Sequence, residues 1–155
     1  MRSRRGGLRV LLDTSFLLPS LGIDTGPAVF EALRALDELH AEAFYSALSL
    51  LEALWVAVRL MKKDIFDEEA FRAGLSSIMA NRRYRRVEET PGVLMEALKL
   101  YELGHADLID NMLYADARQM GLKLLTLDEE LRDFILNAGL EDVFITLDEL
   151  ARLRR

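Results

Sequence analysis

Residues 106–128 read ADLIDNMLYADARQMGLKLLTLD, and this stretch decides the fold class. Apolar side chains recur at helical spacing up to Gly121, a residue type that commonly ends helices. The run LKLLTLD follows directly and is typical of a short buried strand that ends in an acid, Asp128. A helix that leads at once into a buried strand is the repeating unit of an α/β protein with a parallel sheet.

The same alternation of strand and helix continues along the rest of the chain. LRVLLD (8–13) is a second buried strand that ends in an acid, and EAFYS (42–46) leads straight into a long apolar helix. We therefore expect an α/β fold, a three-layer α/β/α sandwich with a mostly parallel central sheet. The expected strands are 8–13, 42–46, 84–89 (an edge strand), 122–128 and 143–146, and the expected helices are 24–40, 47–62, 67–83, 90–104, 106–121, 128–140 and 147–155.

The chain shows no internal repeat and no linker. We expect a single domain over residues 8–155, preceded by a flexible basic tail, residues 1–7. Thr25 and Thr90 are the expected N-caps of the two helices that carry a proline in their first turn.

Composition excludes several classes of protein. The 155 residues contain no cysteine and two histidines, which excludes disulfides and cysteine-ligated zinc or iron–sulfur sites. The two most apolar segments, around 47–61 and 108–127, are interrupted by charges, and neither is long enough for a transmembrane helix. We expect a cytoplasmic protein with no membrane contact. The net charge is −6, so the surface as a whole does not attract nucleic acid. Binding of a polyanion needs either metal ions or a local basic patch, such as the arginines of NRRYRRVEE (81–89), which can equally be a solvated turn.

Glu52 is a single carboxylate within the apolar run ALSLLEALWVAV (47–58). Residues one turn away along the helix carry no positive charge, and the nearest base, Arg59, is about 10 Å away along the axis. A buried carboxylate without a partner is costly. Glu52 is therefore expected to be protonated, to bind a metal or take part in catalysis, to pair with a distant cation, or to be exposed.

Four further acids have positions that suit either a structural or a chemical role. Asp13 and Asp128 stand at the ends of expected strands and can simply cap the helices that follow. Asp107 and Asp110 share one helix face, and Asp107 can also be a cap. Asp110 lies in the second turn between apolar neighbours, where a capping role is harder to assign.

These acids are more informative as a set. In parallel sheets, ligand sites lie at the carboxyl ends of the strands, where Asp13 and Asp128 are expected. Two unit charges about 4 Å apart repel by about 4 kcal/mol at an effective dielectric of 20. Hard cations relieve that repulsion, and ligation by oxygen alone favours Mg²⁺ or Mn²⁺ over zinc. Such ions also let an acidic site accept a phosphodiester.

The chain resembles PIN domains, and most closely the VapC-type toxin ribonucleases of prokaryotic toxin–antitoxin pairs. The likeness covers about residues 8–148 and rests on LLDTSFLL with Asp13, LSLLEALW with Glu52, ADLIDNMLYADARQMG with Asp110, and LKLLTLD with Thr126 and Asp128. The resemblance implies that Asp13, Glu52, Asp110 and Asp128 are catalytic and bind one or two Mg²⁺ or Mn²⁺ ions. Thr14, Ser15 and Thr126 match small hydroxylated positions that line or order the site, and Asp107 is an auxiliary acid or the helix cap.

The leading hypothesis is thus a metal-dependent endoribonuclease with an RNA substrate. Arg82, Arg83, Arg85 and Arg86 are the candidate RNA-binding residues. By resemblance, a small antitoxin protein restrains the activity and the chain forms a homodimer. The main alternative is a catalytically idle PIN-like domain that binds RNA or protein. A phosphatase or response-regulator-like fold with Asp13 as phosphoryl acceptor is disfavoured, because residue 15 is Ser where a second acid is expected and no lysine follows LLTLD.

Overall fold

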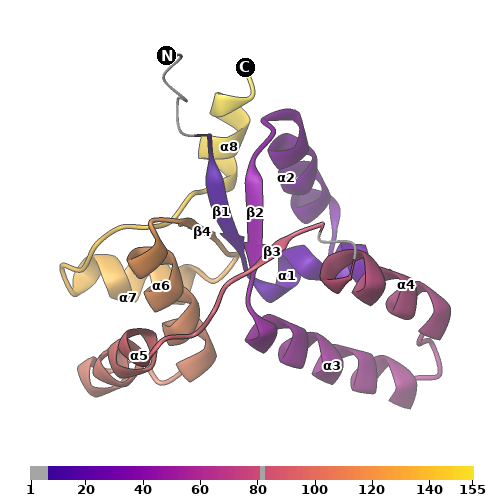
Figure 1. Cartoon of the computed structure of the whole chain (residues 1–155), viewed down its shortest axis with the longest axis horizontal. Helices are drawn as coiled ribbons and strands as arrows, with labels where there is room; N and C mark the ends of the chain where they lie inside the picture. Colours follow the sequence, from indigo (N-terminus) through magenta and orange to yellow (C-terminus); the bar gives the residue numbers. More distant parts are fainter. Residues whose placement is uncertain (1–6, 81–82) are drawn as a thin grey trace.

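A parallel sheet forms the centre of the protein (Figure 1). The computed structural model describes residues 7–80 and 83–155, so the predicted basic tail lies outside the described residues except for Gly7. Within that part of the chain, four strands pair in the order β3-β2-β1-β4, every pair being parallel. Their bounds are β1 Arg9–Leu12, β2 Glu42–Tyr45, β3 Arg85–Arg86 and β4 Lys123–Leu125.

Helices cover both faces of the sheet, as the central strand β1 requires. Val10, Leu11 and Leu12 are fully buried, and successive side chains of a strand point to opposite faces. Val10 and Leu12 therefore join one hydrophobic cluster, while Leu11 joins the other. The first cluster takes residues from α1 (Thr14–Leu17), the 3-10 helix η1 (Leu18–Leu21), α2 (Pro27–Glu38), α3 (Ala47–Lys62), α4 (Glu68–Met79) and α8 (Leu147–Leu153); the second takes residues from α5 (Pro91–Leu103), α6 (Leu108–Met120) and α7 (Glu129–Asn137).

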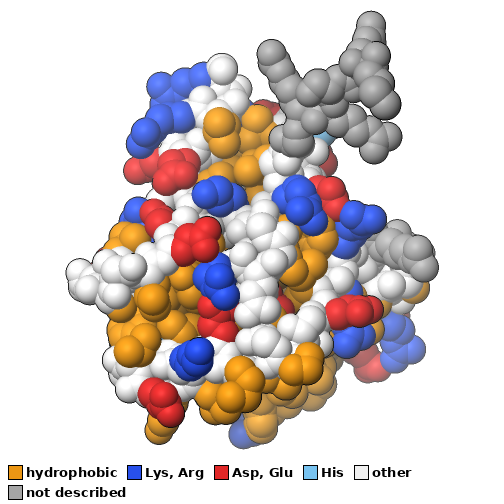
Figure 2. Space-filling view, turned by 60° about the vertical axis from the view of Figure 1, so that its left-hand side comes forward, with side chains coloured by type: hydrophobic (Ala, Val, Ile, Leu, Met, Phe, Trp, Pro, Cys, Tyr) orange, Lys and Arg blue, Asp and Glu red, His pale blue; other side chains and the backbone are white. Residues whose placement is uncertain are grey.

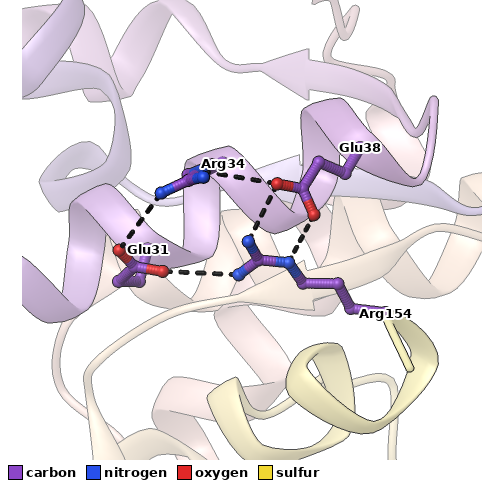
Figure 3. A network of polar contacts seen from close by, with 4 residues as sticks. All are labelled: Glu31, Arg34, Glu38 and Arg154. Atoms are coloured by element: carbon purple, nitrogen blue, oxygen red, sulfur yellow. Dashed lines mark hydrogen bonds and ion pairs between the residues drawn. The ribbon is translucent and has the colours of Figure 1, made fainter.

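Two contacts close the first face. Helix α4 packs so tightly on η1 that a Cβ added at Gly74 would lie 2.2 Å from the carbonyl oxygen of Ser20. Helix α8 is tied to α2 by Arg154, whose Nη2 donates to Glu38 at 2.8 Å and whose Nη1 pairs with Glu31 at 3.3 Å (Figure 3). These ion pairs are largely exposed, so they orient the last helix more than they stabilise the fold.

The α/β fold class is confirmed, but several details of the prediction are wrong. The expected edge strand 84–89 is limited to Arg85–Arg86, and α1 and η1 were not expected. The expected strand 143–146 is reduced to a single bridge between Phe144 and Leu124. Thr25 does not cap α2, because Gly26 is the N-cap and the Thr25 hydroxyl donates instead to the Ser15 carbonyl at 3.2 Å. The helix expected over 67–83 ends at Met79. Among the described residues, no helix is both long and apolar enough to cross a membrane.

Candidate functional site

The ends of β1 and β4 are joined by Asp13. This residue follows β1 directly and caps α1, where its Oδ1 accepts from the Thr14 backbone N–H at 2.6 Å. Its Oδ2 accepts from the Thr126 hydroxyl, also at 2.6 Å. Burial raises the pKa of Asp13, and the charges of Asp128 and Asp107 add to that effect against the two hydrogen bonds. Asp13 is therefore both a structural cap and a fixed carboxylate at the strand ends.

Asp128 lies beside Asp13 because Thr126 contacts both. The Asp128 backbone N–H donates to the Thr126 hydroxyl at 3.0 Å. The Asp128 side chain caps α7 by accepting from the Leu131 backbone N–H at 3.1 Å. The capping role and the position at the strand end, which the sequence presents as alternatives, are thus held by the same residue.

Glu52 comes to the same place from α3. Its Oε1 accepts from the Thr14 hydroxyl at 2.7 Å, and the side chain is half-buried. None of the ion pairs found among residues 7–80 and 83–155 includes Glu52. Burial raises its pKa, and the charges of Asp13 and Asp107 raise it further, against the hydrogen bond from Thr14. A distant cation is thus not its partner in the described chain.

Asp110 completes the group from α6. It is 8% exposed and shares a hydrogen bond with Asp128. Burial, this hydrogen bond and the charges of Asp107 and Asp13 raise the pKa of Asp110 to about 9. Burial also acts on Asp128, but the hydrogen bonds from Asp110 and from backbone N–H groups outweigh it and lower the pKa of Asp128. The pair therefore shares one proton at neutral pH, with Asp110 as the acid.

Asp107 caps α6, and its Oδ1 accepts from the Asp110 backbone N–H at 3.1 Å. Its charge also acts on the carboxyl groups of Asp13, Glu52 and Asp110. The two roles expected for Asp107, cap and auxiliary acid, are therefore compatible.

The donor set at this edge of the sheet consists of carboxylate and hydroxyl oxygens. Among the described residues, no three His, Asp or Glu side chains are grouped closely enough to hold a metal ion together. Asp110 and Asp128 share a hydrogen bond, whereas Glu52, Asp13 and Asp128 are linked through Thr14 and Thr126. The charges of neighbouring carboxylates raise the pKa of Asp13 and of Asp110. A hard divalent cation would relieve this repulsion, so the chemistry of these residues fits Mg²⁺ or Mn²⁺.

Comparison with known proteins identifies the family. The family model of the PIN domain matches residues 10–135, a span that includes every acid described above. This chain belongs to the PIN domain family. Among curated proteins, no sequence matches it.

Solved structures show the same fold at low sequence identity. PAE2754 from Pyrobaculum aerophilum is 21% identical, with a TM-score of 0.62 over 97% of this chain and 93% of that one. VapBC2 from Rickettsia felis, bound to a DNA fragment from its promoter, is 12% identical, with a TM-score of 0.60 over 90% of this chain and 98% of that one. A chain of a toxin–antitoxin complex from Klebsiella pneumoniae is 19% identical, with a TM-score of 0.55 over 87% of this chain and 98% of that one.

Among the described residues, the predicted RNA-binding arginines do not contact the acids of the candidate site. Arg82 is outside the described residues. Arg83 lies over the Tyr84 ring at 5.5 Å, and Arg85 forms an ion pair with Glu42 on the neighbouring strand. Arg86 is exposed. No hydrogen bond or ion pair found in the described chain joins the last three to the acids, so their role in RNA binding stays a prediction.

A buried polar network beneath the site was not predicted from the sequence. Asn111 is fully buried, and its Nδ2 donates to the carbonyls of His105 at 2.8 Å and Ala97 at 3.3 Å. Its Oδ1 is then the acceptor for Nδ1 of His105, at 2.7 Å. This network fixes the turn between α5 and α6, and with it the start of the helix that carries Asp110. Asn111 follows Asp110 on a partly apolar face, and that position is the only sequence signal for it.

A second buried acid was also missed. Asp116 on α6 is fully buried, and neither of its carboxyl oxygens has a partner among the described residues. Burial and the nearby charge of Glu89 raise its pKa to about 7. The signal was the same as for Glu52: an acid between apolar neighbours in a helix, here YADA (114–117).

Proposed function

We propose that this PIN domain is a metal-dependent endoribonuclease, the toxin of a VapBC-type toxin–antitoxin pair. One observation carries the proposal: two chains of hydrogen bonds, Glu52–Thr14–Asp13 and Asp13–Thr126–Asp128, run along the strand ends, and Asp110 closes them. So dense a set of acids is a poor surface for a polyanion unless cations bind there. Membership of the PIN family supports the same reading.

The residues of the chain have distinct parts in this reading. Asp13, Glu52, Asp110 and Asp128 would hold one or two Mg²⁺ or Mn²⁺ ions. When bound, such ions activate a water molecule and stabilise the leaving oxygen of a phosphodiester. Asp110 must first release its proton, which Asp128 now shares.

The two threonines hold carboxylates rather than substrate. Thr14 holds Glu52 and Thr126 holds Asp13, each through its hydroxyl hydrogen. Each carboxylate is thereby fixed in place, and the lone pairs that it does not use in these hydrogen bonds would serve a ligand.

Two exposed apolar surfaces support the further proposal of a homodimer and an antitoxin partner. Trp55 on α3 is 63% exposed, and Figure 2 shows hydrophobic side chains gathered on the lower part of the face that α5 helps to form. Large apolar patches on a protein surface commonly mark interfaces. Several of the structural neighbours are toxin–antitoxin proteins. The exposed side chains are Leu51, Leu54 and Trp55 on α3 and Leu94, Met95, Leu98 and Tyr101 on α5.

The test is cleavage of structured RNA by the purified chain in Mg²⁺ or Mn²⁺. We expect cleavage that EDTA abolishes and that Asp110→Asn removes, while the control Asp133→Asn, an exposed acid on α7, cleaves as the parent does. Cleavage that persists in EDTA or in Asp110→Asn would refute the proposal. Stoichiometric RNA binding without turnover would favour the idle binding module.

A further inference from the structure

A cavity of about 320 Å³ adjoins the acids on the side of α7. It shares Thr126 and Asp128 with the site described above, so a ligand in the cavity is a direct neighbour of anything bound there. Its size is at the lower end of the range for small-ligand pockets and suits a single nucleotide unit. Its wall consists of Thr126, Leu127, Asp128, Glu129, Arg132, Phe144, Ile145, Thr146, Leu147 and Asp148.

Arg132 is the basic residue of this wall, and it lacks a partner. Its Nε is buried and has no hydrogen-bond acceptor among the described residues. None of the ion pairs found in residues 7–80 and 83–155 includes it, whereas Arg118 and Arg154 each pair with a glutamate. No carboxylate of the described residues forms an ion pair with this half-buried guanidinium, so its charge is available to an anion that enters the cavity.

The acids of the wall do not already satisfy Arg132. Asp128 is engaged with Asp110 and with the start of α7. Glu129 and Asp148 are exposed, so solvent weakens their charges. A guanidinium can donate two parallel N–H hydrogen bonds to two oxygens of one anion, and a phosphate group offers such a pair of oxygens.

We propose that Arg132 binds a phosphodiester group of the RNA next to the one that is cleaved, with the adjoining nucleotide in this cavity. The proposal rests on the proposed function, since it places the RNA at the acids. Leu127 and Leu147 supply apolar wall for the sugar or base, and Arg132 supplies the charge. The arginine of this subsite lies on α7, outside the arginine-rich segment 82–86.

The test is binding of single-stranded RNA to the Asp110→Asn protein, which separates binding from cleavage. Adding Arg132→Gln should weaken binding about tenfold and reduce the slope of log K against log salt by about 0.7, the value for one lost phosphate contact. Arg132→Lys should restore the slope but only part of the affinity, since it keeps the charge and loses the fork. The matched control is Arg72→Gln, which removes an exposed arginine on α4 that pairs with Glu68.

A second variant covers the case in which Arg132→Gln does not fold. Asp148→Asn removes an exposed negative charge from the cavity wall and should tighten RNA binding, whereas Asp133→Asn should not. Equal affinity and slope for Arg132→Gln and Arg72→Gln would overturn the proposal, as would absence of RNA binding by the Asp110→Asn protein. If the parent binds RNA through Arg132 but cleaves none with Mg²⁺ or Mn²⁺, the subsite stands and the ribonuclease proposal fails.

Discussion

Asp116 offers a prediction about stability that is independent of metal and substrate. Its carboxyl group is fully buried on α6 with no partner among the described residues, and Glu89 is the nearby charge that acts on it. Its pKa is about 7 in the folded chain against an ordinary value of 3.8. The folded protein therefore binds a proton that the unfolded chain has already lost, and stability falls as pH rises between these two values.

The magnitude follows from the two pKa values. Each pH unit between them is worth about 1.36 kcal/mol, so ionisation of Asp116 removes about 4 kcal/mol of stability in all, of which about 3 kcal/mol is lost between pH 4 and pH 7. Asp116→Asn has the same shape and no charge, so it lacks this dependence. Its buried amide adds a constant cost of about 1–3 kcal/mol, which does not vary with pH. The informative quantity is therefore how the difference in the free energy of unfolding between Asp116→Asn and the parent changes with pH.

The assay is urea denaturation of both proteins in EDTA from pH 4.5 to pH 8.5. The free energy of unfolding of Asp116→Asn minus that of the parent should rise by about 3 kcal/mol across this range, because contributions from Asp110 and other groups cancel. Asp133→Asn, an exposed control, should stay within about 0.5 kcal/mol of the parent throughout. A difference for Asp116→Asn that does not change with pH would refute the reasoning.

Three other outcomes are expected. Glu52→Gln should lose the rise in melting temperature that Mg²⁺ or Mn²⁺ gives the parent, yet fold as well or better in EDTA; unfolding in EDTA would mean that Glu52 has a structural ion-pair partner. Binding of either ion near pH 7 should release about one proton, since the pKa of Asp110 is about 9. Calorimetry in buffers of different ionisation enthalpy measures this release, and a binding enthalpy that does not depend on the buffer would contradict the shared proton. Gly74→Ala should cost several kcal/mol in urea denaturation, because its Cβ would lie 2.2 Å from Ser20 O; a loss below about 1 kcal/mol would show that η1 yields easily.

The sequence predicted most of the fold because its strands are short apolar runs and its helices have clear ends. Gly104 and Gly121 end α5 and α6 as expected, and Thr90 caps α5. The errors lie where a contact with another segment of the chain determines the local structure. Phe144 forms only one bridge, and Thr25 turns to the Ser15 carbonyl, a contact between segments ten residues apart.

The candidate site was predicted in part for the same reason. A parallel sheet brings the carboxyl ends of its strands to one edge, so Asp13 and Asp128 were expected at that edge, and the resemblance to PIN domains added Glu52 and Asp110. Arg132 carried no comparable signal, since an arginine on an amphipathic helix is normally exposed. Arg132 is half-buried and shares the cavity wall with residues 144–148, most of which were expected as a strand but form only one bridge.

The acids of this site show that capping a helix and serving a chemical role do not exclude each other in such a fold. Asp13, Asp107 and Asp128 each cap a helix, and each uses Oδ1 to accept a backbone N–H. A cap fixes the carboxylate through one oxygen and leaves the other to face the strand ends, as Oδ2 of Asp13 does toward Thr126. Helices that start at the carboxyl edge of a parallel sheet therefore supply oriented carboxylates at little extra structural cost. Asparagine retains the cap and removes the charge, so Asp→Asn, rather than Asp→Ala, separates the two roles at each position.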